Sequence, residues 1–196
     1  MKYMILSDLH GSAFWCRRAL DTFREEGAER LLLLGDLLYH GPRNDLPGEY
    51  DPKQVIPLLN GLSGRIFCVR GNCDTEVDQA VLDFPILADY ALLEVTGRVL
   101  YATHGHRWNA SRLPSLQPGD ILLHGHTHVP SWKEKDGIYV LNPGSVSLPK
   151  NGSCHGYMTL EDGLFLWKDL ETRLETHRLL LPRDLRDGTS SFPAFP

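Results

Sequence analysis

Side chains able to bind a metal ion recur directly after short apolar runs of the sequence. In chain order these residues are Asp8, His10, Asp36, Asn72, His104, His126 and His128. Carboxylate oxygens, an amide oxygen and imidazole nitrogens, with no thiolate among them, suit Mn²⁺, Fe or Zn²⁺ better than Ca²⁺. We therefore predict a metal site assembled from five separate segments of the chain.

Each residue taken alone also has a purely structural explanation. An aspartate after a strand, such as Asp8, often forms a turn or caps a helix, and a single histidine such as His104 is often an ordinary hydrogen-bonded residue. The joint pattern favours the metal site. In both Asp8/His10 and His126/His128 the i,i+2 spacing puts the two side chains on one face of an extended segment.

The number of ligands indicates two metal ions rather than one. Seven protein ligands exceed the four to six that a single ion accepts. If one carboxylate bridges, two divalent ions can lie about 3.5–4 Å apart, which is the spacing of two-metal phosphoryl chemistry. Two such cations outweigh two carboxylates and a bridging hydroxide, so the site would attract an anionic phosphate ester.

The elements that must position these residues alternate in the first half of the chain. Apolar runs at 3–6, 31–34 and 66–69 predict strands, and helical patterns at about 13–26 and 53–61 predict the helices between them. This β-α-β-α-β order implies a parallel sheet with right-handed crossovers. Ligands bind beyond the carboxyl ends of such strands, which is where the polar residues stand.

The second half of the sequence predicts antiparallel hairpins. Its expected strands span 91–95, 98–103, 120–124, 131–135, 138–141, 156–161 and 164–168. Three of the turns carry Thr96-Gly97, Asp136-Gly137 and Asp162-Gly163, the dipeptides that close tight hairpins. We expect one domain over residues 1–182, followed by a Pro- and Ser-containing tail at 183–196.

Composition narrows the class of protein. A chain of 196 residues that is 42% hydrophobic can bury a full core. Its net charge of −5 gives no indication of a basic surface that would bind long nucleic acids. No apolar run is long enough for a signal-peptide core or a membrane span. The four cysteines, Cys16, Cys68, Cys73 and Cys154, form no CxxC pair. We therefore expect a cytoplasmic protein that acts on a small anionic substrate, with a homo-oligomer left open.

The motifs together resemble those of the calcineurin-like metallophosphoesterases. They are DxH (Asp8, His10), GD (Asp36), GNxD (Asn72, Asp74), HG (His104) and GHTH (His126, His128), in the expected order. The stretches GDLLYHGPRND, VRGNCDTEVDQ and NPGSVSLPK are similar to the bacterial YfcE-type phosphodiesterases, a resemblance that covers residues 1 to about 150.

This resemblance implies an α/β fold, a four-layer α/β/β/α sandwich of two mixed sheets flanked by helices. It assigns Asp8, His10, Asp36 and His128 to one metal and Asp36, Asn72, His104 and His126 to the other, with Asp36 bridging. The expected cofactors are two divalent ions, first Mn²⁺, with Zn²⁺, Fe or Ni²⁺ as alternatives. The implied reaction is hydrolysis of a phosphodiester by a hydroxide that bridges the metals.

Cys73 departs from the wider superfamily, where histidine commonly follows the asparagine and helps to protonate the leaving group. The sequence leaves three roles open for Cys73: a structural or metal-proximal residue, a proton donor, or a nucleophile. His106 is the candidate proton donor in its place, with His40 the weaker alternative. The candidate catalytic residues are thus Asp36, Asn72, His106 and Asp74, of which Asp74 is expected to orient a neighbour.

The loop after Asp36 and the segment around Cys73 are expected to contact the substrate. Arg43 and Asn44, in the loop after Asp36, and Cys73 are candidates to contact the substrate, whereas Arg70 is expected to point away. The leading function is a metal-dependent phosphodiesterase. A phosphomonoesterase or protein phosphatase is the alternative within enzymes, and a non-catalytic protein-interaction scaffold is the alternative outside them.

Overall fold

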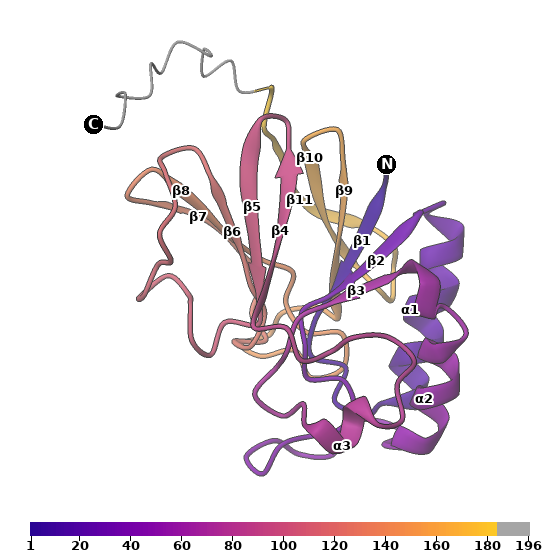
Figure 1. Ribbon diagram of the computed structural model, residues 1–196. Coiled ribbons are helices and arrows are strands. Elements are labelled where there is room, and N and C mark those ends of the chain that lie inside the picture. The colour runs from indigo at the N-terminus through magenta and orange to yellow at the C-terminus, as the bar shows by residue number, and fades with distance from the viewer. Residues whose placement is uncertain (184–196) are drawn as a thin grey trace.

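Two β-sheets pack face to face, and helices cover the outer face of the first (Figure 1). The computed structural model describes residues 1–183, so the predicted tail lies, from residue 184 onward, outside the described residues. None of the helices within residues 1–183 combines the length and the apolar character that crossing a membrane requires.

The first sheet has the strand order β11-β10-β9-β1-β2-β3. Its strands are β1 (Tyr3–Leu6), β2 (Arg30–Leu33), β3 (Ile66–Cys68), β9 (Gly156–Glu161), β10 (Leu164–Asp169) and β11 (Glu175–Leu180). The pairs β1/β2 and β2/β3 are parallel, and the remaining pairs are antiparallel. The predicted parallel β-α-β-α-β half is therefore confirmed.

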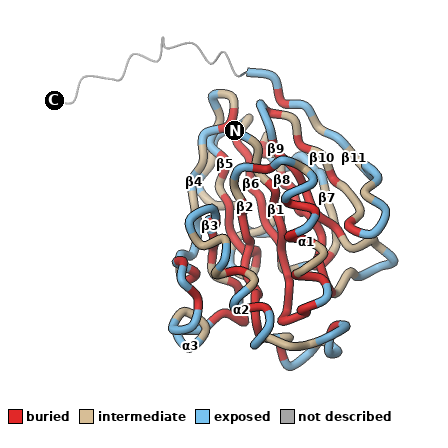
Figure 2. The backbone as a smooth tube through the Cα atoms, turned by 90° about the vertical axis from the view of Figure 1, so that its right-hand side faces the viewer, coloured by how far each residue is buried: buried red, intermediate tan, exposed pale blue. Residues whose placement is uncertain are grey.

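The continuous apolar runs of β1 and β2 reflect burial on both faces. Because side chains alternate along a strand, Met4 and Leu6 face the helices, while Ile5 faces the second sheet. Leu32 of β2 joins Ile5 in the core between the sheets. Figure 2 shows this burial as red tube along the central strands.

The helices begin where the sequence supplies caps. The Ser12 hydroxyl accepts a hydrogen bond from the Trp15 amide at the start of α1 (Ala13–Glu25). Asp51 caps α2 (Pro52–Asn60), which begins with a proline. Thr75 caps the short α3 (Glu76–Gln79) through a capping box.

The second sheet has the order β4-β5-β6-β8-β7, with β5/β6 and β6/β8 parallel. Its strands are β4 (Tyr90–Val95), β5 (Arg98–Thr103), β6 (Ile121–Leu123), β7 (Ser131–Lys135) and β8 (Ile138–Asn142). At all three predicted hairpin turns both central residues have positive φ, as a type I′ turn requires; these are Thr96-Gly97, Asp136-Gly137 and Asp162-Gly163.

The two mixed sheets and the α/β class are confirmed. The outer face of the second sheet carries a loop in residues 104–120, where the expected layering has a helix; Leu113 and Leu116 of this loop pack on Leu122 and Ile138. The sequence patterns did not predict α3 and β11. Residues of β11 alternate only weakly between half-buried and exposed, because it is an edge strand paired with β10 alone.

Candidate metal centre

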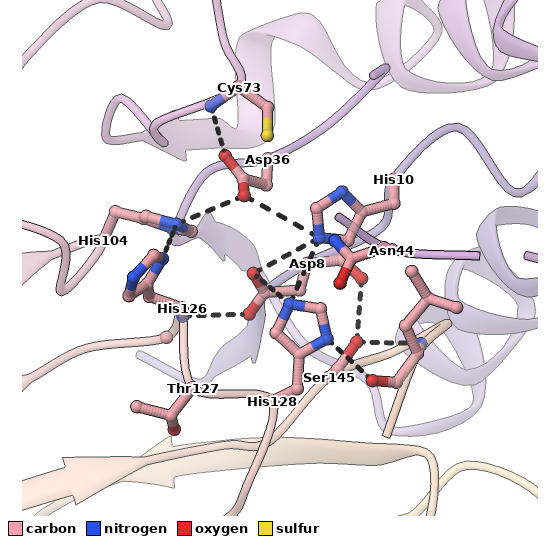
Figure 3. A network of polar contacts seen from close by, with 12 residues as sticks. Asp8, His10, Asp36, Asn44, Cys73, His104, His126, Thr127, His128 and Ser145 are labelled. Carbon is pink, nitrogen blue, oxygen red and sulfur yellow. Dashed lines mark hydrogen bonds and ion pairs between the residues drawn. The ribbon is translucent and has the colours of Figure 1, made fainter. Parts of the chain in front are cut away.

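The predicted ligands follow the carboxyl ends of strands from both sheets, and the six that Figure 3 labels, all except Asn72, lie close together. Three groups of three have donor atoms within 4.8 Å of one another: Asp8, His10 and His128 form the first, Asp36, His104 and His126 the second, and His10, Asp36 and Cys73 the third, which links the other two. Asn72 joins the second group, with Oδ1 3.0 Å from Nε2 of His104. All seven predicted ligands therefore lie in one cluster.

The backbone at this cluster adopts an uncommon conformation. Left-handed φ is sterically disfavoured for residues other than glycine, and such residues gather at functional sites. The residues concerned, with their φ angles, are Asp8 (59°), His10 (48°), Asp36 (56°), His126 (67°) and His128 (61°). The surrounding fold holds five of the seven predicted ligands in this conformation, which aims their side chains at a common centre.

Backbone carbonyls set the tautomers of three histidines. Nδ1 of His10, His104 and His128 contacts a carbonyl oxygen, which can only accept a hydrogen bond, so each Nδ1 donates its proton. The acceptors are the carbonyls of Tyr39 (2.8 Å), Leu34 (2.6 Å) and Leu148 (2.7 Å), respectively. When such a ring is neutral, its lone pair is on Nε2, the atom that a metal ion would bind.

These lone pairs face one another and face oxygen acceptors. Nε2 of His10 lies 3.3 Å from Nε2 of His128, and Nε2 of His104 lies 3.3 Å from Oδ2 of Asp36. Oδ1 of Asp8 is buried and has no hydrogen-bond partner among the described residues. When two hydrogen-bond acceptors face each other in a buried site, burial costs free energy unless a proton or a cation lies between them. The donor set therefore fits divalent metal ions.

The pKa values of the clustered side chains are shifted by burial and by the contacts between these side chains. Burial alone would raise the pKa of Asp8, yet the contact with His10 and the neighbouring imidazoles hold it below the usual carboxyl range. Burial alone would lower the pKa of His104, but its contact with Asp36 raises it to about 9. Burial and the neighbouring His104 lower the pKa of His126 to about 4.

Asp74 orients the loops rather than facing the cluster. Its Oδ2 accepts hydrogen bonds from the amides of Asp36 (2.8 Å) and Gly71 (2.7 Å), and its Oδ1 accepts one from the amide of Leu37 (2.9 Å). The amide of Cys73 in turn donates to Oδ1 of Asp36 (2.8 Å). The two loops after β2 and β3 are thus tied together, which leaves Oδ2 of Asp36 aimed at the histidines.

Residues that the sequence patterns did not single out support Asp8. The hydroxyls of Ser145 and Ser147 each donate to its carbonyl oxygen at 3.0 Å, and the His126 amide donates to its Oδ2 at 3.1 Å. Both serines lie in the NPGSVSLPK stretch, whose sequence indicates only the family resemblance. Their role depends on a contact across more than 130 positions of sequence.

A cavity of about 400 Å³ opens over the cluster. Among its lining residues are Asp36, Asn72, His126 and His128, the predicted substrate residues Arg43, Asn44 and Cys73, and two residues absent from the sequence predictions, Thr127 and Lys150. Arg43 and Lys150 have exposed side chains without an ion-pair partner among residues 1–183. The rim of this polar cavity therefore carries positive charge toward a bound anion.

The remaining candidates fall at different distances from the cluster. The His106 ring lies 5.6 Å from His104 and 6.3 Å from His126, measured between centroids, and its buried Nδ1 has no partner among the described residues. His40 instead packs edge-on against Tyr39 and Tyr50.

Arg70 and Cys73 also have defined positions. Arg70 points away from the cluster, toward Glu76 (3.4 Å). Sγ of Cys73 lies within 4.8 Å of the donor atoms of His10 and Asp36. Burial, followed by the charge of Asp36, raises the pKa of this thiol far above its usual value, so it stays protonated without a metal.

A larger cavity, of about 710 Å³, lies on the outer face of β4 and β5. Its lining includes Tyr90, Leu92, Val99, Tyr101 and Trp108 but none of the clustered ligands. The volume of a cavity therefore does not identify the functional site. The buried donor atoms beneath the polar cavity identify it.

Known proteins have sequences and folds similar to those of this chain. Residues 1–162 match the family model of the calcineurin-like phosphoesterase superfamily domain. Phosphodiesterase YfcE of Escherichia coli K12 is 44% identical over 162 residues, which are 83% of this chain and 88% of that protein. Phosphodiesterase MJ0936 of Methanocaldococcus jannaschii is 27% identical over 167 residues, 81% of this chain and 87% of that protein.

Solved structures give the same result. That of YfcE, a phosphoesterase from E. coli, matches with a TM-score of 0.88 at 41% identity over 91% of this chain and 98% of that chain. A single mutant of Vps29 from Entamoeba histolytica matches with a TM-score of 0.59 at 21% identity over 91% of this chain and 98% of that chain, which shows the fold alone. The family match and the close relative together show that the chain belongs to the calcineurin-like phosphoesterase superfamily, whose members use divalent metal ions.

Proposed function

We propose that this protein is a metal-dependent phosphodiesterase with two divalent ions, Mn²⁺ first among them. The observation that carries the proposal is the buried cluster of imidazole Nε2 atoms and carboxylate oxygens beneath a cavity rimmed by Arg43 and Lys150. Such a cluster demands cations, and the positive rim suits a phosphate group. The names of the relatives YfcE and MJ0936, both phosphodiesterases, support the same activity.

The ligands divide into two sets that share one carboxylate. Asp8, His10, Asp36 and His128 would hold one ion, and Asp36, Asn72, His104 and His126 the other. Two of the three groups of donor atoms support this division, and Oδ2 of Asp36 lies near histidines of both, 3.7 Å from Nε2 of His10 and 3.3 Å from Nε2 of His104. When bound, divalent ions would supply a water of lowered pKa as the nucleophile and would neutralise charge on the phosphoryl oxygens.

The protein's own residues bind the substrate and position the metal ligands. Arg43, Asn44 and Lys150 bind and orient the phosphate at the rim of the polar cavity. Asp74 holds the loops of Asp36 and Gly71 in place through backbone hydrogen bonds, so the ligand geometry exists before the substrate arrives. Cys73 supplies an amide donor to Asp36 and a neutral thiol beside the cluster, which is a structural, metal-proximal role.

Metal dependence tests the proposal. Protein stripped by EDTA should not hydrolyse bis-p-nitrophenyl phosphate, and added Mn²⁺ should restore the activity with close to two ions bound per chain. Release of p-nitrophenol and metal analysis of dialysed protein measure the two quantities. Unchanged activity in EDTA would refute the metal centre. Restored activity on p-nitrophenyl phosphate, with none on the diester, would instead favour the phosphomonoesterase alternative.

His106 is our candidate for protonating the leaving group, because its ring lies beside His104 and His126 at the edge of the cluster. General acid catalysis contributes about 10²–10⁴-fold, and most for poor leaving groups. We expect His106→Asn to lower kcat by about 100-fold for a diester with an alkyl leaving group but by less than about tenfold for a p-nitrophenyl leaving group. His177→Asn, in edge strand β11 and outside the metal-binding cluster, is the matched control and should leave both rates unchanged. Equal losses on the two substrates would exclude the proton-donor role.

A further inference from the structure

A second cavity lies directly beside the polar one. Its volume is about 370 Å³, and its lining is chiefly apolar, with Leu38, Tyr39, Tyr50, Ile56, Val77 and Val81. Cys73 lines both this apolar cavity and the polar cavity over the metal-binding cluster. The two cavities therefore share one short side chain in their walls.

The apolar cavity exposes hydrophobic surface to solvent. Val77 is 76% exposed, Val81 43% and Tyr39 42%. Asp78 also belongs to the lining, but its carboxylate is turned back to the amide (2.7 Å) and hydroxyl (2.8 Å) of Thr75, where it caps α3. A neutral, apolar group entering the cavity would cover the exposed side chains without opposing a free carboxylate.

The polar cavity beyond Cys73 has the opposite character. It carries the exposed cations Arg43 and Lys150 at its rim and the cluster of metal-binding atoms at its base. A molecule that fills both cavities must combine an anionic head with an apolar substituent. A phosphodiester with one aryl or alkyl ester group has this composition.

We propose that the apolar cavity binds an aryl or medium-chain alkyl ester group of the phosphodiester whose phosphate occupies the polar cavity. This inference rests on the proposed function and assigns its substrate class. Val77 and Val81 of the segment around α3 then determine specificity, because they line the apolar cavity but not the polar one and contact only the apolar part of the substrate. Affinity should increase with the length of the alkyl group until the cavity is filled.

Analogues in which a P–C bond replaces one ester and the other ester has a poor leaving group test the inference through binding rather than turnover. Methyl methylphosphonate and methyl hexylphosphonate carry the same monoanionic head and differ in about five methylene groups. Their dissociation constants for the Mn²⁺-loaded protein can be compared by isothermal titration calorimetry. A fully buried methylene is worth about fourfold in affinity, and the cavity is open, so we expect the hexyl compound to bind about 30-fold more tightly.

Charged substitutions in the lining of the apolar cavity provide the second part of the test. Val77→Asp replaces a side chain that is largely exposed on the surface of α3, so the fold should be retained. This variant and Val81→Asp should reduce the hexyl-to-methyl affinity ratio to about threefold or less, since an unpaired charge next to an apolar group is unfavourable, with the methyl compound unaffected. Leu174→Asp, at a 68% exposed position in the turn between β10 and β11, is the matched control.

The possible results separate this inference from the proposed function. A methyl compound that binds and a hexyl compound that binds no more tightly would overturn the apolar subsite and leave the phosphodiesterase proposal standing. An unchanged ratio in both Val77→Asp and Val81→Asp would also overturn the subsite. If neither phosphonate binds the Mn²⁺-loaded protein, both the subsite and the phosphate-binding role of the polar cavity are refuted.

Discussion

An Asp36→Asn variant is expected to lose hydrolysis of bis-p-nitrophenyl phosphate almost completely. Oδ2 of Asp36 lies 3.7 Å from Nε2 of His10 and 3.3 Å from Nε2 of His104, so this one carboxylate serves both proposed metal positions. Loss of an outer-shell partner alone commonly costs about 10–100-fold in metal affinity or activity. Removal of the bridging charge itself should cost more, on the order of 10³-fold in kcat/KM.

The same substitution should leave the fold intact. Asparagine has the shape of aspartate, and its oxygen can still accept the Cys73 amide as Oδ1 does now at 2.8 Å. Its NH₂ group would lie where Oδ2 of Asp36 now contacts the imidazole of His104, so that ion pair is lost. The metal-free variant should therefore stay folded but unfold at a somewhat lower temperature than the metal-free parent. Thermal unfolding in EDTA and equilibrium dialysis against Mn²⁺ measure the two effects.

Asp45→Asn is the control for the loss of one negative charge. Asp45 is exposed in the loop that also carries Arg43 and Asn44, but it is not among the residues that line the polar cavity. Its variant should bind Mn²⁺ and turn over substrate like the parent. A rate near the parental one for Asp36→Asn would show that Asp36 does not bridge two ions.

Gly71→Ala is expected to have the second large effect, on both metal binding and stability. A Cβ atom at this position would lie 2.1 Å from Oδ1 and 2.3 Å from the backbone nitrogen of Asp36, and neither atom can move freely because Asp74 and Cys73 hold this loop. Forcing extra volume into a packed site costs about 1–3 kcal/mol. The displaced carboxylate should also weaken Mn²⁺ binding by at least about tenfold.

Gly64→Ala controls for the loss of a glycine in the same region of the chain. A Cβ atom there would meet nothing within 4 Å, so the free energy of unfolding should change by no more than about 0.5 kcal/mol. Urea unfolding followed by circular dichroism measures stability, and metal analysis measures Mn²⁺ content. Parental stability and Mn²⁺ content in Gly71→Ala would contradict the tight approach of the two loops.

The parallel half of the fold was predictable because its signals are local. Short apolar runs buried on both faces, such as Leu31–Leu34, alternate with capped helices, and a polar residue follows each run within two positions. The dipeptides Thr96-Gly97, Asp136-Gly137 and Asp162-Gly163 likewise carry their turn type within two residues. Edge strand β11 lacks such a signal, since its pairing with β10 is what makes it a strand.

The residues able to bind metal could be identified from the amino-acid sequence, because donor types and their order along the chain are properties of the sequence. How these residues present their atoms depends on the folded chain. The carbonyls of Leu34, Tyr39 and Leu148 set three histidine tautomers from 20 to 70 positions away. Ser145 and the apolar cavity behind Cys73 likewise acquire their roles through contacts between distant segments, which no local pattern records.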